Sequence, residues 1–66
     1  MIIKINGREE TIEKSKNIAE LIASKNLSPE RIVVEHNFKI VPRESWENSL
    51  LNENDSIEVV SFVGGG

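Results

Sequence analysis

The sequence ends in three glycines, Gly64, Gly65 and Gly66, which directly follow a segment typical of a β-strand. Glycine has no Cβ atom, so such a tail can adopt almost any backbone conformation and enter a channel too narrow for side chains. Three extended residues reach roughly 10 Å. These features predict a flexible tail over residues 64–66 that presents the Gly66 carboxylate to another protein's active site. The alternative is a loose end without function, because chain termini are often poorly ordered.

A carboxylate is a poor electrophile, so acyl transfer from Gly66 requires that the carboxylate first be activated. Adenylation by ATP is the usual route, because AMP is a competent leaving group. The sequence has neither a P-loop nor a GxGxxG motif, and no helix follows its three glycines. A separate enzyme would therefore have to activate Gly66, and we expect no cofactor to be bound by this chain.

The side chains do not form a recognisable catalytic or metal site. There is no cysteine, and His36 is the single histidine, which excludes the usual structural zinc sites. His36 is also the only candidate base that could activate a serine as a nucleophile. Acidic residues are spread along the chain, so paired-carboxylate chemistry has no local support. We interpret His36 as structural or solvated and expect no intrinsic enzymatic activity.

Composition narrows the possible partners. The 66 residues are enough for one domain, and eight Lys and Arg against eleven Asp and Glu give a net charge of -3. This balance argues against nucleic-acid binding, which requires clustered positive charge, and is compatible with docking on a basic protein. The apolar runs are too short to span a membrane and no signal peptide is visible. We expect a soluble cytoplasmic protein that is a monomer in the absence of its partners.

The first half of the chain predicts a hairpin and a helix. Alternation over residues 1–5 indicates a strand, Asn6-Gly7 is a strong hairpin signal, and residues 8–14 read as a polar edge strand. Asn17 has the position of a helix N-cap, with Glu20 at capping-box spacing. The apolar stripe of this helix consists of Ile18, Leu21 and Ile22, and Asn26 can end it in a left-handed conformation.

The second half predicts a helical turn and three strands. The helical turn is expected at residues 28–30, and the strands at residues 32–34, 39–41 and 56–63. A tight turn at Asn37 separates the first two of these strands, and Pro42 ends the second. Residues 43–50 are irregular or a short helical turn, for which the expected apolar anchors are Trp46, Leu50 and Leu51.

A hairpin followed by one amphipathic helix predicts an α+β fold, in which a mixed sheet of four to five strands packs on one helix. We expect the last strand to run parallel beside the first in the centre of the sheet. This arrangement is the β-grasp, or ubiquitin-like, fold, with a domain over residues 1–63 and the tail over 64–66. Its predicted core is Ile3, Ile5, Ile18, Leu21, Ile22, Ile57 and Val59.

Period-two alternation in the last strand places Ile57 and Val59 on the core face and Glu58, Val60 and Phe62 on the other face. One helix covers one side of a sheet, so the second set is expected to be exposed beside the tail. We call Glu58, Val60 and Phe62 the docking patch. Its apolar members can anchor a partner, and Glu58 can pair with a partner's Arg or Lys.

One set of residues forms a pattern along the second half of the chain: Asn37, the run Ile40-Val41-Pro42-Arg43-Glu44-Ser45-Trp46, then Leu51, Asp55, Ile57-Glu58-Val59-Val60, Phe62-Val63 and the terminal glycines. By these residues the sequence resembles the ThiS-type sulfur carriers of thiamine thiazole biosynthesis, and the likeness spans the chain. The Val-Pro-Arg-x-x-Trp element is fairly specific to these carriers. Two features differ: Phe38 stands where many relatives have glycine, and three glycines replace the minimal two.

The resemblance implies a cycle of sulfur transfer. A ThiF-like adenylyltransferase would use MgATP to adenylate Gly66, and sulfur from a donor such as a cysteine desulfurase would then leave a terminal thiocarboxylate. A ThiG-like thiazole synthase would accept that sulfur. A molybdopterin-synthase small subunit, a non-covalent ubiquitin-like adaptor and a protein-conjugating modifier remain alternatives with the same fold and tail. The resemblance also implies that Pro42, Arg43 and Trp46 pin the segment before the last strand, and that Arg43 can in addition contact a partner.

Overall fold

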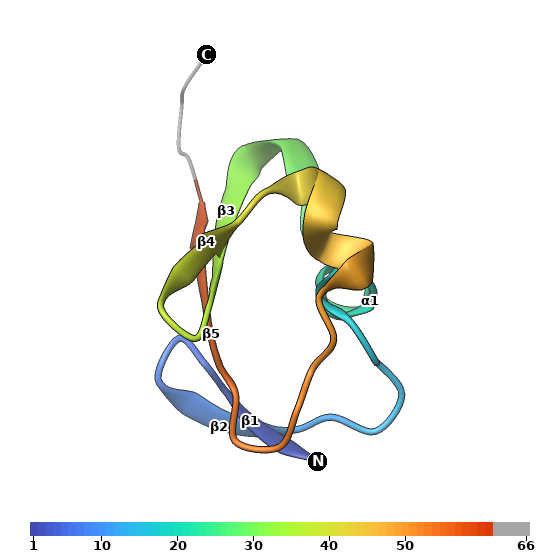
Figure 1. Cartoon of the computed structure of the whole chain (residues 1–66), viewed down its shortest axis with the longest axis vertical. Coiled ribbons are helices and arrows are strands. Elements are labelled where there is room, and N and C mark those ends of the chain that lie inside the picture. Colours follow the sequence, from blue (N-terminus) through green and yellow to red (C-terminus); the bar gives the residue numbers. More distant parts are fainter. Residues whose placement is uncertain (62–66) are drawn as a thin grey trace.

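The computed structural model describes residues 1–61, which form a five-stranded mixed sheet and one α-helix, α1 (Figure 1). The strand order is β2-β1-β5-β3-β4; β5 runs parallel to β1, and the other neighbouring strands are antiparallel. This topology confirms the predicted β-grasp fold with the last strand at its centre. The bounds are β1 Ile2–Ile5, β2 Arg8–Thr11, α1 Ile18–Ser24, β3 Ile32–His36, β4 Lys39–Val41 and β5 Ser56–Ser61, with 3₁₀ turns η1 Pro29–Arg31 and η2 Arg43–Asn48.

The β1–β2 hairpin forms where the sequence predicts it. Asn6 and Gly7 have φ angles of 52° and 83°, as a two-residue turn matched to the twist of the strands requires. The return strand β2 is shorter than expected and lies at the edge of the sheet, where its charged side chains disfavour pairing with other chains.

Helix α1 begins at a side-chain cap. Asn17 Oδ1 accepts a hydrogen bond from the backbone N–H of Glu20 at 2.8 Å, and Glu20 Oε1 accepts one from the N–H of Lys16 at 2.6 Å. The second contact reaches one residue before the cap, a variation on the predicted capping box. The helix ends before Asn26, whose φ of 57° confirms the expected left-handed residue.

The core lies between α1 and the sheet. Every residue of the predicted core is buried except Val59, which is partly buried and packs against the rest. The core also contains side chains from β3 and from the segment before β5. Its buried members are Ile3, Ile5, Ile18, Leu21, Ile22, Ile32, Val34, Trp46, Leu51 and Ile57.

The segment between β4 and β5 is held by two of its three predicted anchors. Trp46 and Leu51 are buried, and Trp46 Nε1 donates to the carbonyl oxygen of Val41 at 3.0 Å. The prediction for Leu50 is wrong, because this side chain is 62% exposed. Leu50 forms an isolated bridge with Asn17, and in extended backbone neighbouring side chains point in opposite directions, so burial of Leu51 turns Leu50 outward.

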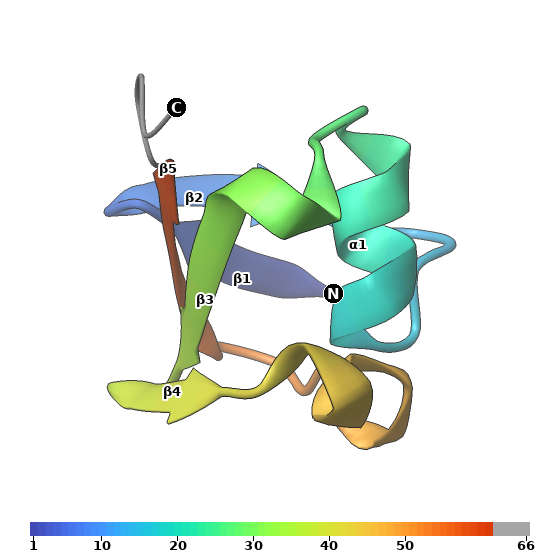
Figure 2. The same ribbon diagram turned by 90° about the horizontal axis from the view of Figure 1, so that it is seen from above.

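The two faces of the sheet differ in what covers them. Figure 2 shows α1 and the helical turns on one side of the sheet. Among residues 1–61, no helix or turn packs on the opposite side, which we call the outer face. The outer face is therefore the part of the sheet on which side chains are free to meet another protein.

Candidate functional site

The outer face of β5 carries the described part of the docking patch. Ile57 is fully buried on the core face, whereas Val60 is 50% exposed and Glu58 is half-buried. The predicted alternation of this strand is therefore confirmed for Ile57 through Val60. Phe62 lies outside the described residues, as do Val63 and the tail residues Gly64, Gly65 and Gly66.

The neighbouring strand β3 adds residues to this surface that sequence reasoning missed. Glu35 lies directly opposite Glu58, and Val33 directly opposite Val60, in the antiparallel register of β3 and β5. On β4, Ile40 lies opposite Glu35 and is 66% exposed. The alternation within residues 32–36, where Ile32 and Val34 are buried, indicates that Val33 and Glu35 point to the outer face. Which residues of β5 lie opposite them depends on the register between the strands, which cannot be read from the sequence.

The two facing carboxylates make the middle of the outer face acidic. No cation of residues 1–61 forms an ion pair with Glu35 or Glu58. Like charges directly opposite each other on a sheet are destabilising. A partner that places a basic side chain between these carboxylates would remove the repulsion and gain two charge-assisted hydrogen bonds.

Strand β5 is fixed by polar contacts at its start and by the β1–β2 turn farther along. Asn6 Oδ1 accepts from the N–H of Val59 at 2.8 Å, and the N–H of Asn6 donates to the carbonyl oxygen of Ile57 at 2.8 Å. The side chain of Asn6 thus occupies a backbone donor on β5 close to the point where the described chain ends. These contacts hold Ile57 and Val59, near the end of the described chain, in a defined position.

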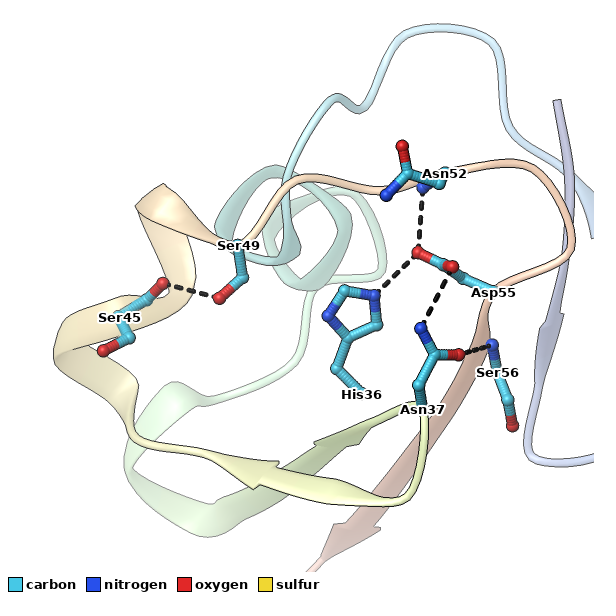
Figure 3. Close-up of polar contacts among 7 residues, drawn as sticks. All are labelled: His36, Asn37, Ser45, Ser49, Asn52, Asp55 and Ser56. Carbon is cyan, nitrogen blue, oxygen red and sulfur yellow. Dashed lines mark hydrogen bonds and ion pairs between the residues drawn. The ribbon is translucent and has the colours of Figure 1, made fainter.

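A buried carboxylate at Asp55 organises the start of β5 (Figure 3). Asp55 Oδ2 lies 2.7 Å from His36 Nε2 and accepts from the N–H of Asn52 at 2.8 Å. Its Oδ1 accepts from Asn37 Nδ2 at 3.1 Å, and Asn37 Oδ1 in turn accepts from the N–H of Ser56 at 2.9 Å. This network ties the β3–β4 turn to the first residue of β5.

These contacts also set the ionisation of Asp55. Burial opposes its charged form, but the hydrogen bonds from His36, the Asn52 backbone and Asn37 outweigh burial and hold the pKa of Asp55 below its usual value. The carboxylate is therefore ionised and satisfied at neutral pH. His36 acts as its hydrogen-bond partner, which confirms the structural interpretation of this histidine.

The remaining chemistry of the described chain is limited. Within residues 1–61, no group of three or more acidic or histidine side chains is arranged to hold a metal ion. The helices found in that part of the chain are too short or too polar to cross a membrane. Arg43 lies 4.0 Å from Glu30, and both side chains are largely exposed, so this pair contributes little to stability.

Comparison with known proteins gives consistent results. The model of the ThiS family matches residues 3–66. The sulfur carrier protein ThiS of Bacillus subtilis is 35% identical over 66 residues, which cover 98% of this chain and 100% of that protein. A crystal structure of the thiamine biosynthesis protein ThiS from Geobacter metallireducens superposes with a TM-score of 0.84 at 28% identity, covering 100% of both chains. A thiazole synthase of Paramagnetospirillum magneticum is 33% identical over 66 residues, but this chain spans 20% of its length.

Proposed function

The chain belongs to the ThiS family, and from this premise we propose that it carries sulfur for thiamine biosynthesis as a thiocarboxylate on Gly66. The observation that carries the proposal is the extent of the family match, which runs from the first strand through residue 66 and so includes the glycine tail. The anchoring of β5 supports it, because its pairing with β3 continues to Ser61 and the Asn6 side chain accepts from Val59, which gives a firm base for the five residues that follow Ser61. Five extended residues can span at most about 17 Å.

The chemistry requires three steps, all at the terminal carboxyl group. In a partner adenylyltransferase of the ThiF type, a carboxylate oxygen attacks the α-phosphorus of MgATP, and pyrophosphate leaves. The terminal sulfur of a donor persulfide, such as that of a cysteine desulfurase, then attacks the acyl carbon, and AMP leaves. A thiol cleaves the resulting S–S bond, which releases the thiocarboxylate and leaves a disulfide on the donor side.

We propose that a thiazole synthase receives the sulfur. The support is the thiazole synthase of P. magneticum, in which a segment of the same length resembles this chain. Fusion of two proteins into one chain raises their effective concentration and is of use when the two must meet repeatedly. Once sulfur is transferred, the carrier returns as the carboxylate and can be activated again.

The docking patch of Glu58, Val60 and Phe62 is proposed to seat the carrier on the adenylyltransferase. Val60 supplies exposed apolar area, and Glu58 with Glu35 supplies negative charge on the same face that no cation of residues 1–61 pairs. An apolar anchor surrounded by charge is the usual composition of a contact that fixes both affinity and orientation. The chain itself contributes no catalytic group in this proposal; its part is to present a reactive terminus.

The proposal is tested by the intact mass of the protein after incubation with a ThiF-type adenylyltransferase, MgATP, a persulfide-loaded cysteine desulfurase and a thiol reductant. We expect the mass to increase by the exchange of one oxygen for one sulfur, and fragmentation to place the change on Gly66. Omission of MgATP is the matched control and should abolish the change.

Two outcomes would contradict sulfur carriage. An unchanged mass, when the same enzymes convert the B. subtilis carrier, would exclude the chain as a substrate. Stable attachment of Gly66 to lysines of other proteins would instead identify a protein modifier. Transfer of the sulfur to a molybdopterin precursor, but not to a thiazole synthase, would assign the chain to the molybdopterin pathway.

A further inference from the structure

Phe38 occupies a backbone conformation that costs free energy. Asn37 and Phe38 form the two-residue turn between β3 and β4, and their φ angles are 52° and 72°. Such a turn strongly favours glycine at its second position, because a Cβ atom there crowds the backbone. A bulky aromatic residue in the left-handed region is a rare choice that points to a use for the side chain.

Packing within the chain does not compensate for this conformation. The Phe38 side chain is 80% exposed, more than any other large apolar side chain in residues 1–61. The turn that carries it is nevertheless firmly held, because the N–H of Asn37 donates to the carbonyl oxygen of Ser56 at 2.7 Å and the Asn37 side chain bonds Asp55 and Ser56. The structure thus presents an aromatic ring to solvent from a rigid base.

Phe38 lies on the same face of the sheet as the docking patch. It borders a hollow of 470 Å³ with outer-face residues that include Ile2, Lys4 and Ser56. Ser56 belongs to the row of β5 that continues to Glu58 and Val60. Val60 is four residues along β5 from Ser56, a distance of about 13 Å, and both therefore fit within one protein–protein interface of ordinary size.

The carboxylates between Phe38 and Val60 determine which kind of partner surface can cover these two side chains. Glu35 and Glu58 face each other between the Phe38 turn and Val60, without an ion pair in residues 1–61. A surface that covers both apolar points must also cover these carboxylates. Burial of unpaired carboxylates is costly, so the covering surface has to bring a cation.

We propose that Phe38 is a second anchor for the adenylating partner, which holds the ring in an apolar pocket and places an arginine or lysine between Glu35 and Glu58. The inference rests on the proposed function and extends its docking patch along β5 to the far end of the strand. Two separate anchors fix the rotation of the carrier on the enzyme, whereas a single anchor leaves it free to turn. The Phe38 anchor thereby determines the direction in which β5 and the residues after it enter the active site.

The test is Phe38→Gly in the full chain, with the dissociation constant for the ThiF-type adenylyltransferase measured by calorimetry and the melting temperature measured separately. We expect binding to weaken at least tenfold while the melting temperature rises, because glycine relieves the left-handed strain. Phe38→Asn, which also suits this turn, should behave in the same way. Leu50→Ala, at an exposed leucine away from the outer face, is the matched control and should leave binding unchanged.

Unchanged binding of both Phe38 variants would overturn the proposal. A lowered melting temperature for both variants would also overturn it, because it would show that the ring supports the fold. The same holds if the variants weaken binding to a thiazole synthase but not to the adenylyltransferase. The proposed function fails separately, if wild-type protein binds the adenylyltransferase through Phe38 but never acquires a thiocarboxylate.

Discussion

His36 Nε2 lies 2.7 Å from Asp55 Oδ2, and this contact joins the last residue of β3 to the residue that precedes β5. Both side chains are largely withdrawn from solvent, and Asp55 is buried among otherwise apolar core residues. Strand β5 therefore starts at a polar junction. No buried side-chain nitrogen or oxygen of the described residues, those of the junction included, lacks a hydrogen-bond partner. Such a junction fixes where β5 begins more sharply than apolar packing alone.

Asp55→Asn should lower stability at neutral pH by about 1–3 kcal/mol, since an amide cannot accept all of the hydrogen bonds that converge on the carboxylate. The pKa of Asp55 is lowered in the folded state, so its stabilising contribution is present above the unfolded value of about 3.9 and is lost as pH falls through the lower folded value. Urea unfolding measured between neutral and acidic pH should show wild type and variant converging below about pH 4. Curves that remain parallel over this range would show that Asp55 does not stabilise the fold through its charge.

Removal of Gly66, or addition of one residue after it, should abolish thiocarboxylate formation and leave the fold intact. The reactive group is the terminal carboxylate in our proposal, and the buried core residues found in residues 1–61 run from Ile3 to Ile57. Intact mass reports the thiocarboxylate, and circular dichroism reports the fold. A thiocarboxylate on the extended protein, with unchanged dichroism, would place the sulfur elsewhere.

Val60→Asp should weaken binding to the adenylyltransferase by about 2 kcal/mol, close to thirtyfold, while melting changes little. Val60 is half exposed on the outer face, so an aspartate there is solvated in the free protein but buried and unpaired in the complex. We expect the same of Phe62→Asp, at a position outside the described residues. A Val60→Asp protein that fails to fold would mean that this face is part of the core.

Leu21→Ala should destabilise the domain by about 2–5 kcal/mol, because it leaves a cavity where α1 meets the sheet. Leu21 is 1% exposed and belongs to the central cluster. A domain of this size has a total stability of about 5 kcal/mol, so the variant should be largely unfolded at growth temperature. Leu50→Ala removes the same atoms from an exposed position and should change thermal melting little; equal losses for both variants would refute the assignment of α1 to the core.

Local patterns in the sequence were sufficient for the elements and their inward faces. The Asn6-Gly7 turn, the Asn17 cap and the stripe from Ile18 to Ile22 depend on residues a few positions apart, and the structure confirms each of them. The central place of β5 also followed from the order of elements, because a hairpin and a crossover helix leave few ways to complete a sheet.

Contacts between distant segments were decided by the tertiary structure. The facing pair Glu35–Glu58 and the network around Asp55 exist only once β3 and β5 adopt a particular register, and a shift by one residue would turn every side chain to the other face. Leu50 shows the same limit, since its neighbour Leu51 took the buried position when the loop closed on α1. A sequence specifies period and propensity locally, whereas register and loop closure depend on the packing of the whole chain.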